Sequence, residues 1–144
     1  MASEELHTET KLEFVANAPE YYEFIRQLRN DDRVQGGFIE RVSITPEQQL
    51  AYMAKHADCY YVCLCNGHPA GYIGAIDGDI RIATHPDFQG VGVGLFMVRE
   101  LVKRHPGCIA RVKHGNSASL RLFKRAGFTE TFVILQSPPQ ALAE

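Results

Sequence analysis

The chain has 144 residues, of which 45% are hydrophobic and 22% are charged; these proportions are typical of a soluble globular domain with one core. A formal net charge of −2 argues against a general nucleic-acid-binding protein, and no apolar run is long enough to span a bilayer. The acidic N-terminus lacks the apolar stretch of a secretory signal. We expect one cytoplasmic domain over residues 1–144, with flexible tails at 1–9 and 137–144 and with neither nucleic acid nor a membrane as partner.

The first half of the chain predicts a strand, two helices and an antiparallel meander. Residues 11–15 alternate in polarity as a strand does, and Asn17 with Pro19 marks the start of a helix that ends near residue 29. Thr45, followed by Pro46 and Gln48, predicts a capped second helix that runs to about residue 56. The meander follows as strands at 60–65, 70–76 and 80–84, joined by turns at Asn66-Gly67 and Asp77-Gly78.

The second half predicts alternating helices and strands. An amphipathic helix is expected at about 92–104, where His105-Pro106-Gly107 stops it, and a strand follows at 108–113. The next helix, at 117–126, has Asn116 as its cap and Gly127 in the usual closing position. The pattern ends with a strand at 128–135. No internal repeat or domain boundary is visible in this order of elements.

The four cysteines, at 59, 63, 65 and 108, match no common zinc spacing, and the histidines do not complete one. We therefore expect no metal site. Cys63 and Cys65 are alternate residues of a predicted strand and should share one of its faces. Buried, reduced thiols are the interpretation that this pattern favours.

The most informative stretch is Gln89-Gly90-Val91-Gly92-Val93-Gly94, which lies between a predicted strand and a predicted helix. A helix start carries backbone N–H groups without partners and partial positive charge, so it can bind phosphate. Glycines at 90, 92 and 94 would let an anion approach the backbone, although a tight packing turn explains them equally well. The stretch is not a Walker loop, because no Gly-Lys-Ser/Thr follows, and its spacing and position differ from the dinucleotide fingerprint.

Two blocks in this half resemble one family. Gln89–Gly94, preceded by Pro86, resembles the Gln/Arg-x-x-Gly-x-Gly/Ala signature of the GCN5-related N-acetyltransferases, the GNAT superfamily. The block from Asn116 to Phe128 resembles the family's Asn-x-x-Ala/Ser-x-x-Leu-Tyr-x-x-x-Gly-Phe segment. The resemblance implies an α/β (α+β) fold: a central mixed, mostly antiparallel sheet, flanked by about four helices and splayed between strands four and five, here 80–84 and 108–113.

The resemblance also implies acetyl-CoA as the cofactor. The backbone of Gln89, Gly90, Val91, Gly92, Val93 and Gly94 would hold the pyrophosphate, and that of Ile82, Ala83 and Thr84 would pair with the pantetheine arm and polarise the acetyl carbonyl. Asn116 is interpreted as a helix cap, as a cofactor contact, or as both. Ser119 occupies a position that often faces the cofactor. Phe123 stands where the family usually has a tyrosine that protonates the leaving thiolate.

Phe123 has no proton to give to the leaving thiolate. The general acid is therefore another group or water, or the reaction needs no general acid because a thiolate leaves well. Ser119 and Tyr72 are weaker substitutes. Asp79 is the main candidate for general base, because the resemblance implies a carboxylate at this position, seven residues before Pro86, in many relatives. Its alternative role is to belong only to the turn around Gly78. His85 has a suitable intrinsic pKa, and its alternative is an exposed loop imidazole.

For the acceptor, the residues around Arg29-Asn30 resemble a branch whose members acetylate amino groups of nucleotide-linked sugars, ribosomal proteins or polyamines; the alternative role of this pair is to end the first helix. Glu40 and Tyr52 would reach the acceptor only if the region around the first two helices folds over it. We expect a small-molecule primary amine, an amino sugar or sugar nucleotide first. The alternatives are a protein, peptide or polyamine acceptor and a non-catalytic acyl-CoA-binding module. Dimers are frequent in the family, so a homodimer is a further expectation.

Overall fold

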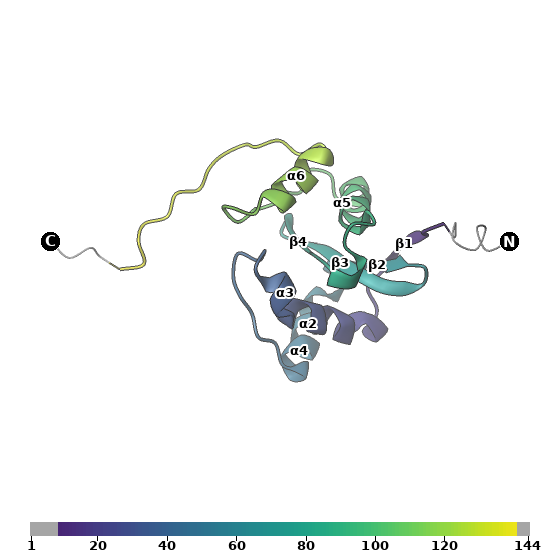
Figure 1. The fold of residues 1–144 in the computed structure, drawn as a ribbon. Helices are drawn as coiled ribbons and strands as arrows, with labels where there is room; N and C mark the ends of the chain where they lie inside the picture. The colour runs from purple at the N-terminus through teal and green to yellow at the C-terminus, as the bar shows by residue number, and fades with distance from the viewer. Residues whose placement is uncertain (1–8, 141–144) are drawn as a thin grey trace.

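The computed structural model describes residues 9–140 and contains a four-stranded sheet between two layers of helices (Figure 1). Of the tails expected at 1–9 and 137–144, residues 1–8 and 141–144 lie outside the described residues. In chain order the elements are β1 (Leu12–Ala16), η1 (Pro19–Tyr21), α2 (Tyr22–Asn30), α3 (Asp32–Gln35), α4 (Pro46–His56), η2 (Ala57–Cys59), β2 (Tyr60–Cys65), β3 (His68–Ile76), β4 (Asp79–Thr84), η3 (Pro86–Phe88), α5 (Val93–Arg104) and α6 (Ser117–Arg125).

The sheet has the order β1-β2-β3-β4, and every neighbouring pair is antiparallel. Both predicted hairpin turns are confirmed. Asn66 and Gly67 have φ of 50° and 84°, and Asp77 and Gly78 have φ of 51° and 80°, the left-handed pairs that a tight two-residue hairpin needs. The turns bring β4 to the edge of the meander.

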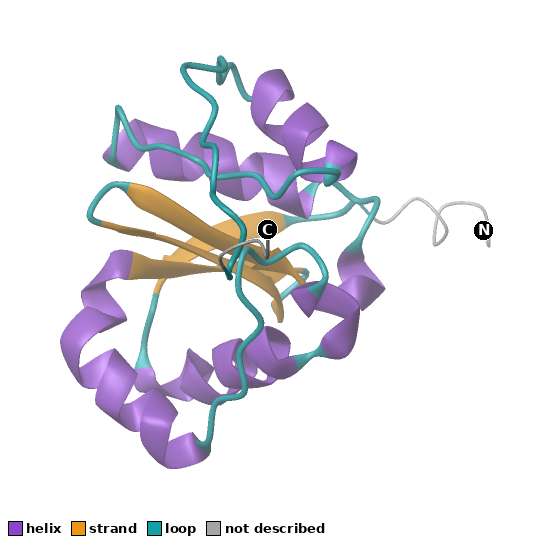
Figure 2. Cartoon of the chain, turned by 90° about the vertical axis from the view of Figure 1, so that its left-hand side faces the viewer, coloured by secondary structure: helices purple, strands orange, loops and turns teal. Residues whose placement is uncertain are grey.

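Helices cover both faces of the sheet, as Figure 2 shows. On one face α5 and α6 pack over a core that includes Cys63, Ile73, Met97, Leu101 and Phe123. On the other face α2 and α4 pack over a second core, formed by Ile25, Leu28, Met53, Tyr60, Val62, Tyr72 and Ala83. Side chains alternate along β4, so Ile80 belongs to the first core and Ala83 to the second. The same alternation decides which side chains of β4 face the α5 and α6 layer and which face the α2 and α4 layer.

The helix starts agree with the sequence except at Asn17. Thr45 and Gln48 form the predicted capping box, in which the Thr45 hydroxyl accepts from the Gln48 N–H at 3.1 Å and the Gln48 side chain accepts from the Thr45 N–H at 2.9 Å. The cap assigned to Asn17 is wrong, because its amide instead donates to the Ala57 carbonyl at 3.3 Å. Asn17 therefore ties the end of β1 to the end of α4.

Two predicted strands do not form. Of residues 108–113, only Ile109 pairs, in a single parallel bridge to Asp79. Residues 128–135 have no partner strand within residues 9–140, and the chain from there leaves the body as an extended, exposed segment, yellow in Figure 1. Both stretches have strand-forming sequences, but a strand needs a hydrogen-bonded neighbour along its length. The first stretch has one only at Ile109, and the second has none within residues 9–140. The predicted mixed sheet is thus an antiparallel sheet with one parallel bridge.

All four cysteines are free thiols, and Cys63 and Cys65 are buried in the same core, as their spacing predicted. Burial raises the pKa of the Cys63 thiol to about 11, so this thiol stays protonated at neutral pH and packs as an apolar side chain. No helix in the described part of the chain is long and apolar enough to cross a membrane.

Candidate active site

The glycine-rich turn connects β4 to α5. Gly92 is the N-cap of α5 and has φ of 87°, and Gly90 has φ of 84°. Both values lie in the left-handed region, which a residue with a Cβ adopts at a cost. A Cβ built on either glycine would meet no atom within 4 Å, so the outer side of the turn is open to a ligand.

Backbone N–H groups accumulate at this turn without partners. Within the described residues, no carbonyl or side chain accepts from the N–H groups of residues 90–95, and the first bond of the helix runs from Phe96 N–H to the Gly92 carbonyl at 3.0 Å. Unpaired N–H groups in sequence, next to the positive end of the α5 dipole, form a concave site for an anion. The turn has the chemistry to bind a phosphate or diphosphate.

Gly94 serves a different purpose. A Cβ there would lie 3.3 Å from Leu122 Cδ2 on α6 and 3.7 Å from the Thr84 hydroxyl. The absence of a side chain therefore lets α6 pack closely on the first turn of α5. The packing interpretation holds for Gly94, whereas Gly90 and Gly92 are needed for their backbone conformation.

Beside the turn, β4 has an open edge. The Ile80 N–H donates to the Ile109 carbonyl at 2.9 Å and the Ile109 N–H to the Gly78 carbonyl at 2.7 Å, after which the backbone of residues 110–113 makes no hydrogen bond to β4. Hydrogen-bonding direction alternates along a strand, so Ile82 and Thr84, like Ile80, present their N–H and carbonyl groups to this side. Ala83 faces the opposite way, in register with Tyr72 of β3. The open edge runs from the bridge to the glycine turn.

The three candidates Asn116, Ser119 and Phe123 lie at the cap and along the length of α6. The Asn116 side chain accepts from the Ser119 N–H at 3.1 Å and so caps α6 as predicted. A hollow of about 380 Å³ lies next to this cap, between Gly36-Gly37 and residues 113–116. Phe123 is 5% exposed, and its ring lies 5.2 Å from that of Phe128 in the core. It offers the gap no proton donor.

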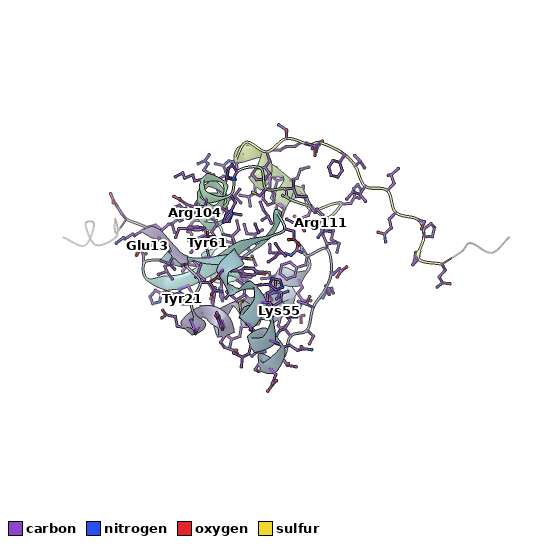
Figure 3. The ribbon with its side chains drawn as sticks, turned by 180° about the vertical axis from the view of Figure 1, so that it is seen from behind. Glu13, Tyr21, Lys55, Tyr61, Arg104 and Arg111 are labelled. Atoms are coloured by element: carbon purple, nitrogen blue, oxygen red, sulfur yellow. The ribbon has the colours of Figure 1, made fainter. Side chains whose placement is uncertain are left out.

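An arginine–aspartate–arginine cluster lies at the closed end of the gap. One carboxylate oxygen of Asp79 accepts from Arg81 and, at 2.7 Å, from Arg111, which is labelled in Figure 3. The other oxygen is buried and has no partner within residues 9–140. Burial raises the pKa of Asp79, but the hydrogen bonds from Arg111 and Arg81 outweigh it and hold this pKa below its ordinary value. Asp79 is therefore an ionised anchor for two guanidinium groups.

The depressed pKa of Asp79 has a consequence for stability. A carboxylate with a lowered folded-state pKa stabilises the fold above its unfolded-state pKa of about 3.9, and this contribution is lost as the pH falls through the lower, folded value. We expect the wild-type protein to lose free energy of unfolding more steeply below about pH 4 than Asp79→Asn does. Urea unfolding at a series of pH values measures this difference. Asp58→Asn, at an exposed carboxylate, is the control, and identical pH profiles for wild type and Asp79→Asn would contradict the expectation.

Sequence reasoning missed Arg111, because its contact with Asp79 joins residues far apart in the chain. One signal could have found it. If residues 80–84 and 108–113 are parallel neighbours, then alternate residues on each lie on one face, and Arg81 and Arg111 come together. The hydrogen bond to Asp79 raises the pKa of Arg111, and the charge of Glu40 adds to this shift.

A row of aromatic hydroxyls continues from the cluster under α2 and α4. The Arg29 guanidinium lies 4.9 Å from the centre of the Tyr52 ring, the Tyr52 and Tyr60 hydroxyls are 2.6 Å apart, and the Tyr60 and Tyr72 rings are 5.9 Å apart. Burial raises the pKa of Tyr60 and of Tyr72, so both remain protonated. Arg29 and Tyr52 are thus brought together on the same face of the sheet as Asp79 and Arg81.

Asn30 does not join this row. Its side-chain amide donates to the Ile44 carbonyl and accepts from the Ile44 N–H, both at 2.8 Å. Both polar atoms are therefore used in holding the α3–α4 connection against the end of α2. This side chain therefore holds the α3–α4 connection in place.

His85 lies at the other end of β4. Its Nδ1 accepts from the Asp87 N–H at 3.1 Å, its ring stacks on Phe24, and it lines a separate groove of about 500 Å³ together with Asp31 and Arg33. Six positions along a strand separate His85 from Asp79, a distance of roughly 20 Å. The two candidates therefore cannot act on the same reacting carbon.

Comparison with known proteins agrees with this arrangement. The model of the Acetyltransferase (GNAT) family matches residues 22–128. No curated protein matches the chain in sequence. Among solved structures, the spermidine N-acetyltransferase of Vibrio cholerae, in complex with CoA and spermine, is similar with a TM-score of 0.74 at 16% identity, covering 84% of this chain and 82% of that chain.

Two further structures show the same fold. YncA of Salmonella typhimurium, with its cofactor acetyl-CoA, has a TM-score of 0.67 at 20% identity over 87% of this chain and 82% of its own. The aminoglycoside N-acetyltransferase AAC(6')-Iy, in complex with CoA, has a TM-score of 0.68 at 16% identity, covering 94% of this chain and 99% of that chain. The family match extends over most of the sequence, and it includes the glycine turn, β4 and α6. The chain therefore belongs to the GNAT acetyltransferase family.

Proposed function

We propose that this protein transfers the acetyl group of acetyl-CoA to a primary amine of a small molecule, by direct attack in a ternary complex. The observation that carries the proposal is the run of unpaired N–H groups at residues 90–95, next to the open edge of β4. A diphosphate at the turn and an amide-rich arm along the strand fit these two features together. A simple packing turn would need neither.

The backbone provides the cofactor contacts in this proposal. The N–H groups from Gly90 to Gly94 bind the pyrophosphate, and the outward groups of Ile82 and Thr84 pair with the pantetheine arm. The Ile82 N–H is the donor placed to polarise the acetyl carbonyl. Gln89 and Ala83 contribute less, because the Gln89 N–H already donates to the Pro86 carbonyl and Ala83 faces β3. Asn116 and Ser119 border the arm from α6.

Chemistry then needs little beyond position. The neutral amine attacks the thioester carbonyl, a C–N bond forms, the C–S bond breaks, and coenzyme A leaves as a thiolate. Holding both substrates in one gap supplies much of the rate. Phe123 cannot protonate the thiolate, which leaves well without help. Asp79, with its free buried oxygen, is the better of the two base candidates for the amine proton, through water, because it lies at the closed end of the gap.

The charge of the acceptor side favours an acceptor with an anionic group. The acceptor side is the face of the sheet under α2 and α4, and Arg29, Arg81 and Arg111 border it. Asp79 is the one carboxylate of this cluster, and it lies between Arg81 and Arg111. An amino sugar linked to a nucleotide, whose phosphates would meet the guanidinium groups, remains our first candidate. The relatives named for spermidine and aminoglycosides act on polycations, which these arginines would repel.

A non-catalytic acyl-CoA-binding module is the second candidate, and Phe123 is the observation that favours it. Thiol release from acetyl-CoA, measured with a panel of amino-sugar nucleotides, free amino sugars, polyamines, aminoglycosides and peptides, separates the candidates. We expect turnover with an amino-sugar nucleotide and much weaker turnover with spermidine. Tight coenzyme A binding without turnover on any amine would instead establish the binding module.

A further inference from the structure

Tyr72 of β3 carries a buried hydroxyl that is left without a partner. The side chain is 2% exposed, and its hydroxyl makes no hydrogen bond within residues 9–140. The unpaired oxygens of Gln49 and Asp79 are sealed from solvent, whereas the Tyr72 oxygen is not, so a ligand can reach it. A buried O–H without a partner is costly, and the site therefore favours a ligand atom that accepts from it.

The register of the sheet places Tyr72 on the acceptor side. Tyr72 pairs with Ala83 of β4, and both side chains belong to the core under α2 and α4. Arg81 shares this face of β4 and lies diagonally across from Tyr72, within reach of aromatic and long side chains. Tyr72 is therefore next to the strand that takes the acetyl group in the proposed function.

The neighbouring groups decide which kind of atom the hydroxyl can meet. The Tyr52 and Tyr60 hydroxyls, 2.6 Å apart, pair with each other. Arg29, 4.9 Å from the centre of the Tyr52 ring, and Arg81 carry guanidinium groups, which donate hydrogen bonds and accept none. Burial raises the pKa of Tyr72, and the charges of Arg29 and Arg81 partly offset this rise. Hydrogen-bond donors in a positive field favour an anionic oxygen as their partner.

Tyr72 is poorly suited to protonate the leaving thiolate. A general acid works best when its pKa is near the operating pH, and burial moves the pKa of Tyr72 further above neutral pH. The phenol therefore keeps its proton and can offer it in a hydrogen bond. A role in recognising the acceptor fits this chemistry, and a role in proton transfer does not.

We propose that Tyr72 is a specificity-determining residue of the acetyl transfer, whose O–H donates to an anionic oxygen of the acceptor in the positive field of Arg29 and Arg81. This inference rests on the proposed function and assigns a selecting group to it. The site takes an amine that carries a phosphate or another anionic oxygen. An amine without such an oxygen leaves the hydroxyl buried and unpaired, so the site binds it weakly.

Acceptor kinetics of Tyr72→Phe test this role, because phenylalanine keeps the ring and removes only the oxygen. With UDP-glucosamine, whose diphosphate carries anionic oxygens, KM should rise about tenfold to a hundredfold. With glucosamine, which has no anionic oxygen, KM should stay at its wild-type value, and so should KM for acetyl-CoA. Equal changes with both amines would indicate a structural effect and overturn the proposal.

Tyr61→Phe is the matched control. Tyr61, labelled in Figure 3, belongs to β2, packs in the core under α5 and α6, and has its hydroxyl 3.1 Å from His105 Nε2. Its loss should leave KM for both amines unchanged. In thermal unfolding Tyr72→Phe should melt no lower than wild type, since the removed hydroxyl has no protein partner. A clearly lower melting temperature would show that the hydroxyl is bonded within the protein and would contradict the proposal.

Isothermal titration of UDP-glucosamine into protein saturated with coenzyme A separates this inference from the proposed function. Wild-type protein should bind this amine, and Tyr72→Phe should bind it about tenfold more weakly or worse. That result without turnover would retain the role of Tyr72 in binding and reject acetyl transfer. Equal affinities, or no binding by wild type, would overturn the role of Tyr72, while turnover of another amine would leave acetyl transfer intact.

Discussion

Gly92→Val is expected to weaken coenzyme A binding by about tenfold to a hundredfold, since each lost hydrogen bond to a charged group is worth about 1.5–3 kcal/mol. Gly92 has φ of 87°, and a β-branched residue strongly disfavours this conformation. The turn should relax, so that the N–H groups of residues 90–95 no longer converge. The valine side chain would also occupy the open space from which the diphosphate approaches.

Gly107→Val is a closely matched control for this change. Gly107 follows the other end of α5, has φ of 86°, and likewise has open space where a Cβ would lie. Both variants should therefore lose stability to a similar extent in thermal unfolding. Isothermal titration with coenzyme A should show a loss of affinity for Gly92→Val alone. Equal affinities for the two variants would refute the role of the turn in binding the cofactor.

Arg111→Gln is expected to raise KM for a phosphorylated amine acceptor by about tenfold to a hundredfold, the effect of losing one or two charge-assisted hydrogen bonds. KM for acetyl-CoA should stay unchanged, because this side chain lies on the α2 and α4 side of the gap together with Asp79 and Arg81. Arg81 would still anchor Asp79, so the cluster should persist. Steady-state kinetics with each substrate varied in turn measure this split.

Arg33→Gln tests the competing location of the acceptor. Arg33 pairs with Asp31 at 2.7 Å and lines the groove beside His85. The substitution removes one paired guanidinium there, as Arg111→Gln does at the cluster, and we expect no change in the acceptor KM. The reverse result, an effect of Arg33→Gln without one of Arg111→Gln, would move the acceptor to the His85 groove and make His85 the better base candidate.

Local signals in the sequence predicted the elements whose stability depends on neighbouring residues. The capping box at Thr45, the tight turns at Asn66-Gly67 and Asp77-Gly78, and the glycine at the start of α5 each depend on a few adjacent residues. Their conformations therefore follow from side-chain chemistry within one turn. The motifs at Gln89–Gly94 and Asn116–Phe128 pointed to the family for the same reason, and the family match confirmed it.

Contacts between distant residues were not predictable in this way. Asp79 was expected as a general base or a turn residue, and the structure places it between Arg81 and Arg111 with a lowered pKa. Asn17 was expected as a cap, but it reaches Ala57 instead. Arg111 and Ala57 lie far along the chain from Asp79 and Asn17, so the residues next to Asp79 and Asn17 do not identify these partners.

By itself, the sequence determined the family, the order of the four strands of the sheet with helices α2, α4, α5 and α6, and the position of the glycine turn. Only the tertiary structure decided that Ile82 and Thr84, rather than Ala83, face the open edge, and that residues 108–113 and 128–135 do not form strands. The physical reason is the same for both. A residue's own chemistry sets its turn or helix, whereas a strand and the direction of its hydrogen bonds exist only in relation to a neighbouring strand.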